Sequence, residues 1–236
     1  MGAPAAYRII DVGVLFKMFK EKRNYLSSPE NWEDHWEKLD LEFSKRKHTE
    51  LFIRLRKRIF AQCWSLESYS WALWKINSPY GYGVRIKSTI DELFQSLPYY
   101  FQRRYKMKDI IHGVQYFKEE EIEKIIEKII KNEGIRVKSI TKMFYLKRRA
   151  YEFEKEVRLI LPKLESSPGL TPESIGNKKF IYYNCDPCNY ITSIYFDSNI
   201  NEYIFKIFKD KLRKYGFKGV IERSAIYQKP ERLKII

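Results

Sequence analysis

The sequence predicts an α+β fold in which short β-strands and short helices alternate at irregular spacing. The side chains of residues 58–65 separate onto two faces with the period of two that a strand requires. Residues 119–132 place their isoleucines on one stripe at helical spacing, and Gly134 follows the end of this expected helix. No regular strand–helix–strand repeat connects such segments, which favours α+β over a doubly wound sheet.

Expected elements cover most of the remaining chain in the same irregular order. The pattern predicts strands within 7–16 (or a strand that runs into a helix), 25–28, 84–86, 112–117, 156–161, 180–183, 191–196, 219–223 and 233–236. It predicts helices within 32–52, 68–75, 89–97 and 201–215, and a Lys-rich helical stretch before Tyr151. Residues 165–178, rich in Ser, Pro, Gly and Asn, are expected to be a loop between two strands. Because no change in composition demands a second domain, we expect residues 1–236 to form a single domain.

Composition favours a folded protein that lies outside membranes. Hydrophobic residues make up 44% of the chain and aromatic residues 16%, which is enough to fill a core, so disorder is a poor description of most of the chain. No apolar run approaches the roughly 18 residues that a membrane span needs. The N-terminus lacks the basic region that precedes the apolar stretch of a secretory signal. The expected location is therefore the cytoplasm.

The three cysteines are expected to be ordinary loop or core residues. Cys185 and Cys188 have the spacing of a metal or redox pair, but zinc would need two further ligands. Only Cys63 and three scattered histidines are available for that role. In a thioredoxin-type site the second cysteine would lie inside a helix, whereas a strand-like run follows Cys188. An odd cysteine count also fits a reducing compartment, and we expect no bound metal.

The net charge of +15 allows attraction to nucleic acid, acidic proteins or phosphorylated small molecules. Basic residues cluster at 54–58, 103–108 and 147–149. However, Lys, Ile, Asn and Tyr are all abundant, as they are in proteins encoded by AT-rich genomes. The charge alone therefore does not distinguish a nucleic-acid-binding surface from a Lys-rich one.

The run Glu154-x-Glu156-x-Arg158 is the strongest candidate for a functional motif. If it forms the start of the strand at 156–161, its three charged side chains share one face. Two adjacent carboxylates repel each other, so one pKa would be raised unless a cation such as Arg158 compensates. Such a pair can stabilise a developing positive charge or hold a sugar hydroxyl.

The same run also has alternative interpretations. In a helix, Glu154 and Arg158 would simply form an ion pair one turn apart. In an exposed strand, the charges would form a solvated ladder. A metal-dependent nuclease could use Glu154, Glu156 and Asp34, although no Asp or His lies at ligand spacing beside the glutamates.

Five short motifs follow one another along nearly the whole chain. They are Tyr7-Arg8, Ser27-Ser28-Pro29 with the acidic aromatic patch to Asp34, Cys63-Trp64-Ser65, Trp71 and Trp74 with Gly83, and Lys147 followed by residues 151–158. In this order they resemble the bacterial family named domain of unknown function 2971. The chain departs from that family at Glu33 and His35, where the family usually has Asn and Pro. The chemistry of that loop therefore stays open.

The layout is in turn similar to the Arg–Ser–Glu pattern of the ADP-ribosyltransferase fold, a domain of short, twisted and split β-sheets with interleaved short helices. This resemblance implies that NAD is the substrate. It implies that Arg8, on the first strand, contacts the NAD phosphates or ribose, and that Ser65 positions the nicotinamide ribose. Glu156 would bond the ribose 2′-hydroxyl, and Glu154 would orient the acceptor.

The chemistry of nicotinamide departure suits these residue types. Departure leaves an oxocarbenium-like ribosyl centre, which a fixed carboxylate stabilises electrostatically. Aromatic neighbours would stack on nicotinamide, and the candidates are Tyr7, Trp64 and Tyr82.

Two functions follow from the sequence. The first is an NAD-dependent ADP-ribosyltransferase-like enzyme, for example a bacterial toxin or phage-defence effector, with a protein or nucleic acid as acceptor. The second is a basic, non-catalytic domain that binds nucleic acid or protein. The first predicts that Arg8, Ser65 and Glu156 meet in one cleft, and the second predicts a steep salt dependence of nucleic-acid affinity.

Overall fold

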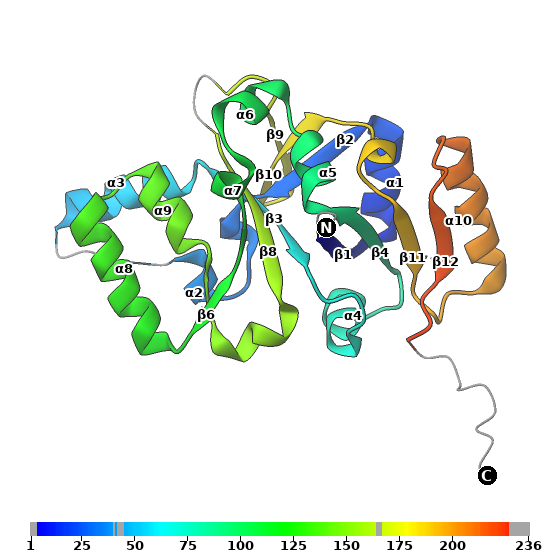
Figure 1. Cartoon of the computed structure of the whole chain (residues 1–236), viewed down its shortest axis with the longest axis horizontal. Coiled ribbons are helices and arrows are strands. Elements are labelled where there is room, and N and C mark those ends of the chain that lie inside the picture. The colour runs from blue at the N-terminus through cyan, green and yellow to red at the C-terminus, as the bar shows by residue number, and fades with distance from the viewer. Residues whose placement is uncertain (1–3, 40, 42–44, 164–166, 227–236) are drawn as a thin grey trace, which may run out of the picture.

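A mixed β-sheet organises the computed structural model, which describes residues 4–39, 41, 45–163 and 167–226. In this described part, ten strands form one sheet (Figure 1). They are β1 (Ala5–Asp11), β2 (Arg23–Ser27), β3 (Ile59–Ser65), β4 (Gly83–Thr89), β5 (Ile111–Gly113), β8 (Glu156–Pro162), β9 (Thr171–Ile175), β10 (Lys178–Asn184), β11 (Ser193–Phe196) and β12 (Val220–Arg223). The pairings are antiparallel except for that of β11 with β12. Two further strands, β6 (Gln115–Phe117) and β7 (Leu146–Arg148), pair in parallel with each other.

The sheet splits at β3. One edge of β3 pairs with β8 along its whole length, from Ile59 to Ser65. In the described ranges its other edge meets β2 at the single pair Ser27–Ala61 and β1 at the single pair Tyr7–Ser65. Strands β1 and β2 therefore diverge from each other along this edge, and β1, β4, β11 and β12 form one arm of the sheet while β2, β10 and β9 form another.

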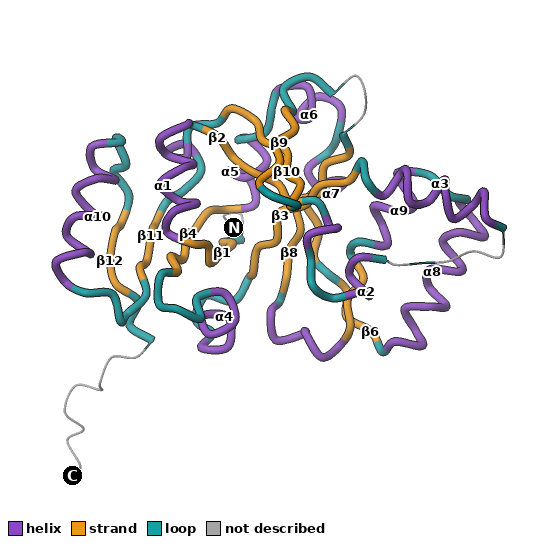
Figure 2. Tube along the Cα trace, turned by 180° about the vertical axis from the view of Figure 1, so that it is seen from behind, coloured by secondary structure: helices purple, strands orange, loops and turns teal. Residues whose placement is uncertain are grey.

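Helices cover the sheet, and further helices lie at both ends of the molecule. They are α1 (Val12–Glu21), α2 (His35–Lys38), α3 (Arg46–Arg56), α4 (Trp71–Asn77), α5 (Ile90–Gln95), α6 (Tyr99–Arg104), α7 (Met107–Ile110), α8 (Glu119–Glu133), α9 (Val137–Met143) and α10 (Glu202–Lys214), with the 3-10 helices η1 (Pro29–Asn31), η2 (Arg149–Glu154) and η3 (Pro187–Asn189). Figures 1 and 2 show α3, α8 and α9 together at one end of the molecule, and α10 beside β12 at the other.

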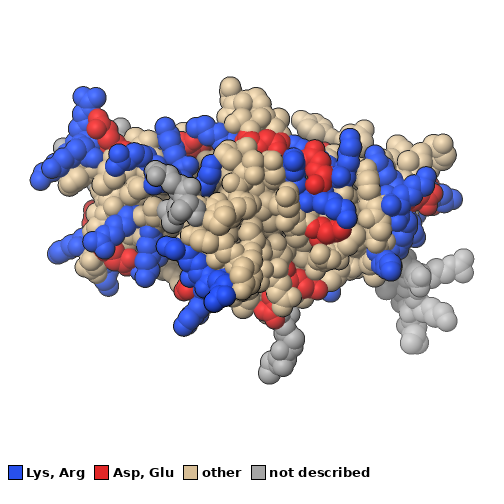
Figure 3. Space-filling model, turned by 90° about the horizontal axis from the view of Figure 1, so that it is seen from above, with Lys and Arg blue, Asp and Glu red and all other residues tan. Residues whose placement is uncertain are grey.

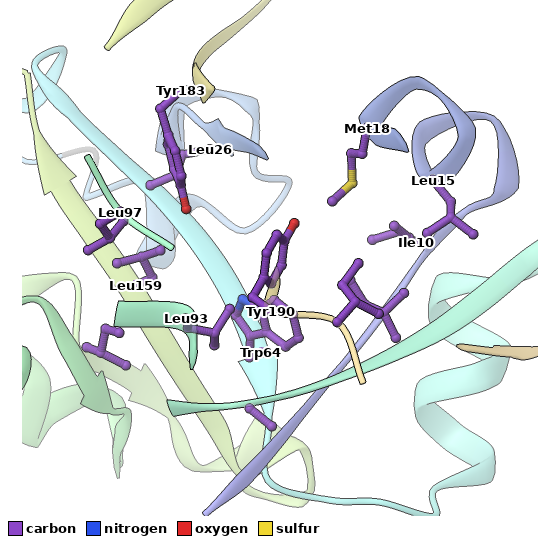
Figure 4. Close-up of a cluster of buried hydrophobic side chains, with 14 of the residues drawn as sticks. Ile10, Leu15, Met18, Leu26, Trp64, Leu93, Leu97, Leu159, Tyr183 and Tyr190 are labelled. Atoms are coloured by element: carbon purple, nitrogen blue, oxygen red, sulfur yellow. The ribbon is translucent and has the colours of Figure 1, made fainter. Parts of the chain in front are cut away.

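Two hydrophobic clusters lie on opposite faces of the central pair β3–β8. Phe60, Trp64 and Leu159 belong to the larger cluster, while Ile59 and Ile160 belong to the second. This division follows from the two-residue period of a strand, and it explains why every residue of β8 is buried. In Figure 4 the larger cluster joins side chains of α1 to side chains of β1, β3, α5 and β10. The second cluster is closed by α3, α8 and α9.

Most predicted elements are present, and the mixed arrangement of helices and sheet is confirmed. The segment 7–16 is a strand that runs into a helix, and Gly134 ends α8 with a positive φ of 70°. The expected strand at 233–236 lies outside the described residues.

Several boundaries were wrong. The range 165–178 is not simply a loop, because it contains the strand β9, which forms a hairpin with β10. The stretch 32–52 is not one helix, because Leu39 adopts a left-handed conformation that ends α2. The strand expected at 112–117 is divided at Val114 into β5 and β6, which pair with different partners. The Lys-rich stretch before Tyr151 contains β7 as well as a helix.

No helix in the described ranges is both long and apolar enough to cross a membrane.

Candidate active site

A cavity of about 360 Å³ opens beside β3, at the split in the sheet. Its wall includes all five residues that the sequence analysis selected as site residues, namely Tyr7, Arg8, Ser65, Glu154 and Glu156. These residues come from three distant parts of the chain. The structure therefore meets the geometric condition that the transferase hypothesis set.

Strand register explains how the residues meet. Ser65 ends β3 and pairs with Glu156, the first residue of β8, on one side. On the other side it pairs with Tyr7 of β1. Because directly paired residues point to the same face of a sheet, Tyr7, Ser65 and Glu156 form a row across three strands.

Glu154 reaches the same place by a different route from the one expected. It is not on the strand but ends the 3-10 helix η2, and Lys155 follows with a φ of 43°. The single-face arrangement of Glu154, Glu156 and Arg158 is therefore wrong for Glu154. The Ser65 hydroxyl fixes this turn by donating a 2.5 Å hydrogen bond to the Glu154 carbonyl oxygen.

Lys147 holds the two glutamates together. Its Nζ lies 2.7 Å from Glu154 Oε2 and 2.9 Å from Glu156 Oε2. It also lies 3.0 Å from Glu37 Oε1, which comes from α2. Lys147 occupies β7, seven residues before Glu154, so the lysine in the family-like motif acts as a bridge between carboxylates.

Arg158 completes this charge cluster from inside the sheet. Its Nε donates to Glu156 Oε1 at 2.7 Å, and its Nη2 donates to Glu156 Oε2 at 3.0 Å and also to Glu37. Nη1 donates to the Phe144 carbonyl oxygen at 2.7 Å, and the guanidinium lies over the Trp32 ring at 4.5 Å from its centre. Arg158 has no exposed surface, so it is a buried ion-pair partner; the ion-pair role was predicted, and the burial was not.

The cluster keeps Glu156 ionised. Burial opposes the charge of Glu156, but the charge and hydrogen bonds of Arg158 and the charge of Lys147 outweigh burial and lower its pKa to about 2. Burial raises the pKa of Glu154, which Lys147 only partly offsets. Burial and the nearby Glu156 also raise the pKa of the Cys63 thiol well above its ordinary value, so this thiol stays protonated. The two glutamates thus differ: one is a fixed anion and the other accepts a proton more readily.

Arg8 is a half-buried cation at the gap between β1 and β3. The pleat of β1 places it on the face opposite to Tyr7, near Cys63, Tyr183 and Tyr190. Burial lowers its pKa, but a guanidinium remains charged at neutral pH. Arg8 forms no hydrogen bond or ion pair with any residue in the described ranges.

Arg85 is a second cation in the cavity wall, and it was not among the predicted site residues. It lies on β4 opposite Ile9, and its guanidinium lies over the rings of Tyr7 and Tyr195. Nη1 donates to the Ser68 carbonyl oxygen, while the buried Nε has no hydrogen-bond partner among the described residues. The alternation of β4 was the available signal, because it puts Arg85 on the face of Tyr7 once the pairing with β1 is known.

The aromatic candidates divide into two groups. Tyr7 and Trp64 line the cavity, but Tyr82 is exposed and lies outside its wall. Trp32 and Trp74, which belong to the other family-like motifs, also line it.

Other predicted site features do not join the cavity. Asp34 pairs with Arg148 at 2.8 Å and caps α2, and it is not among the residues that line the cavity with Glu154 and Glu156. No group of three or more His, Cys, Asp or Glu side chains in the described part is arranged to hold a metal. The basic cluster 147–149 is not a free cationic surface, because Lys147 is buried and Arg148 is bound by two carboxylates.

Ser65→Ala is expected to lower the free energy of unfolding by about 1 kcal/mol, because it removes the hydrogen bond to the Glu154 carbonyl and the acceptor for the Glu67 N–H. Urea unfolding measures this change. Ser174→Ala, at an exposed position of β9, is the matched control and should change stability by less than about 0.5 kcal/mol. Equal stability of the two variants would show that Ser65 does not hold the η2 turn.

Comparisons of the chain with protein-family models, with curated proteins and with solved structures found no match. The resemblance to the domain of unknown function 2971 family and to the ADP-ribosyltransferase layout therefore stays a prediction.

Proposed function

We propose that this protein is an NAD-dependent ADP-ribosyltransferase-like enzyme whose active site is the cavity at the split of the sheet. The observation that carries the proposal is the distribution of charge around this single cavity. Two arginines with unused donors lie on β1 and β4, and a fixed carboxylate lies at the start of β8. NAD has the complementary pattern, with an anionic pyrophosphate at its centre and a ribosyl carbon that becomes cationic as nicotinamide leaves.

The arginines support binding of the pyrophosphate. A half-buried cation without a counter-ion costs free energy in the empty protein, and an anionic ligand recovers that cost. The buried Arg85 Nε lacks a hydrogen-bond partner among the described residues, and a phosphate oxygen would accept from it. Arg8 adds a second positive charge to the cavity wall from the neighbouring strand, on the opposite face of the β1–β4 pair from Arg85.

The carboxylates support the bond-breaking step. When the bond between ribose C1′ and the nicotinamide nitrogen breaks, both electrons leave with nicotinamide, and positive charge develops on the ribosyl ring. Glu156 is held in place by Arg158 and Lys147, so its negative charge needs no reorganisation to stabilise that centre. The acceptor atom then bonds to C1′, and Glu154, whose pKa is raised, takes the proton that the acceptor releases.

NAD is expected to raise the melting temperature of the wild-type protein and to be cleaved with release of nicotinamide. At a hundredfold excess of NAD over its Kd the stabilisation is about 2.7 kcal/mol, which corresponds to several degrees for a chain of this size. Arg85→Gln should raise the Kd for NAD about tenfold, because it removes a charged hydrogen-bond donor. Thermal unfolding with and without NAD, and chromatographic detection of nicotinamide, measure both effects.

Arg46→Gln is the matched control, since Arg46 lies on the exposed surface of α3 in an ion pair with Glu50. It should bind and cleave NAD as the wild type does. A wild-type protein that shows neither a thermal shift nor nicotinamide release would refute the proposed function.

The alternative of a basic, non-catalytic binding domain has less support on the face that Figure 3 shows. Figure 3 shows Lys and Arg side chains spread over the face seen from above, interspersed with Asp and Glu and separated by a broad uncharged band. A nucleic-acid-binding face usually gathers its cations into a continuous patch or stripe. The net charge of +15 nevertheless leaves nucleic acid as one possible class of acceptor.

A further inference from the structure

A second cavity, of about 690 Å³, is lined by residues of α7, α8 and α9. Figures 1 and 2 show α8 and α9 at the end of the molecule opposite to α10, with α7 nearer the centre. The wall of the cavity comes from these helices and from β5, β6, β7 and β8. None of the residues proposed above to bind or cleave NAD lines it. Its volume falls in the range of pockets that hold small organic ligands.

Six aliphatic side chains form the apolar part of this wall. They are Ile110, Ile125, Ile129, Val137, Leu146 and Ile160. Ile160 and Leu146 are buried members of the second hydrophobic cluster, and Ile125 and Ile129 pack against that cluster from α8. A ligand in this cavity would therefore place an apolar body against the inner face of α8.

Tyr145 gives the cavity a polar group that the protein leaves unused. This residue lines the cavity, is only 9% exposed and has a buried hydroxyl with no hydrogen-bond partner among the described residues. A buried hydroxyl without a partner is unfavourable, so it marks a position where a ligand acceptor would be stabilised. The next side chain on this wall, His112, lies 5.2 Å from the Tyr145 ring, centre to centre.

Two lysines give the rim a net positive charge. Lys108 of α7 and Lys138 of α9 form no hydrogen bond or ion pair within the described part of the chain. Of the other charged residues of the rim, Lys142 pairs with Glu133, and Asp109 accepts a hydrogen bond from the Lys106 N–H and keeps a negative charge that acts on Tyr145. The lysines outnumber this single carboxylate among the lining residues, so the rim is positive overall.

We propose that this second cavity binds an amphipathic organic anion, with an aliphatic body against α8 and a carboxylate that accepts from Tyr145 and is attracted by Lys108 and Lys138. The site is separate from the NAD cavity and does not depend on the function proposed for it. The apolar part of the wall and the positive rim fit a medium-chain carboxylic acid, for which decanoate is the probe.

Decanoate is expected to bind the wild-type protein with a 1:1 stoichiometry in isothermal titration calorimetry and to raise its melting temperature. Tyr145→Phe keeps the ring and removes only the hydroxyl, so it should weaken decanoate binding about tenfold. The double variant Lys108→Gln/Lys138→Gln should weaken it by a similar factor. The double variant Lys124→Gln/Lys128→Gln, which removes the same charge from exposed positions of α8, should bind as the wild type does.

Ile129→Trp, which fills the cavity, separates this site from adventitious binding elsewhere and should abolish binding while circular dichroism shows an unchanged fold. The proposal fails if decanoate does not bind below its micellar concentration, or if a folded Ile129→Trp binds it as the wild type does. It also fails if decanol, the uncharged counterpart, binds as tightly as decanoate, because the lysines would then not favour an anion over a neutral ligand. NAD cleavage by wild-type protein without decanoate binding would contradict this inference alone.

Discussion

Glu156→Gln is expected to reduce nicotinamide release from NAD by about 10²–10³-fold, the loss that follows removal of one preorganised electrostatic group from an active site. The substitution keeps the shape of the side chain and removes its negative charge. The ribosyl centre then develops positive charge without the anion that Arg158 and Lys147 hold in place. Single-turnover cleavage at saturating NAD measures this effect separately from binding.

The same substitution should lower the free energy of unfolding by about 3 kcal/mol, because Arg158 and Lys147 lose part of their counter-charge in a buried site. Activity is therefore measured at a temperature where circular dichroism shows the variant to be folded. NAD binding should persist in the folded variant, since Arg8 and Arg85 are unchanged. A loss of activity that came from unfolding alone would remove binding as well.

Glu154→Gln tests whether the two glutamates of the site have different roles. Among the described residues the Glu154 carboxylate bonds only Lys147, so this variant should be less destabilised than Glu156→Gln. It should impair transfer to an acceptor more than release of nicotinamide, because its proposed role is to accept the acceptor's proton. Glu50→Gln, in an exposed ion pair of α3, is the control for loss of a carboxylate and should have wild-type activity. A folded Glu156→Gln with wild-type nicotinamide release would exclude Glu156 as the electrostatic catalyst.

Local pattern was sufficient to predict most strands and the residues at their ends. Arg8 lies on the first strand and Ser65 closes β3, as expected, because alternation and hydrophobic runs are properties of a few consecutive residues. The five selected residues, which the resemblance and the Glu-x-Glu run indicated, line one cavity even though one of the predicted element boundaries was wrong. Glu154 shows this well: it lies on a 3-10 helix and not on a strand, yet it reaches Lys147 beside Glu156.

The local sequence pattern could not predict which distant segments pair with each other. Glu37 joins the charge cluster from a four-residue helix, and nothing in its own neighbourhood marks it as a partner of Arg158. Arg85 becomes part of the cavity only through the register of β4 with β1. The left-handed residues Leu39 and Lys155 were also unpredictable, because such conformations usually occur at Gly or Asn and tertiary contacts impose them here. Leu39, for example, is buried in the second hydrophobic cluster.

Arg158→Met is expected to lower the free energy of unfolding at pH 7 by about 3–5 kcal/mol, the usual cost of removing one partner from a buried ion pair. The variant fills a similar volume but leaves Glu156 and Glu37 without their shared cation, and it leaves the Phe144 carbonyl without its donor. Arg46→Met removes the same side chain from an exposed pair with Glu50, so it should cost less than about 1 kcal/mol.

The dependence of stability on pH tests the cause of this loss. In the wild type the folded-state pKa of Glu156 is about 2, below its ordinary value of 4.5. Between these values the unfolded chain binds a proton that the folded protein does not, so acid favours unfolding. The difference corresponds to about 3 kcal/mol, which is fully present above pH 4.5 and is lost as the pH falls through 2.

Without Arg158 the main influence that lowers the pKa of Glu156 is gone, and its folded-state and unfolded-state values move closer together. The variant should therefore lose less stability than the wild type between pH 4.5 and pH 2, so that the two stability curves converge in acid. Urea unfolding at pH 7, 4.5, 3 and 2 measures the free energy of unfolding of both proteins. The stability curve of Arg46→Met should run parallel to that of the wild type at every pH. If the stability curve of Arg158→Met also runs parallel to that of the wild type, the stability that Arg158 provides does not come from holding Glu156 ionised. Another group would then have to keep Glu156 as the fixed anion on which the proposed bond cleavage depends.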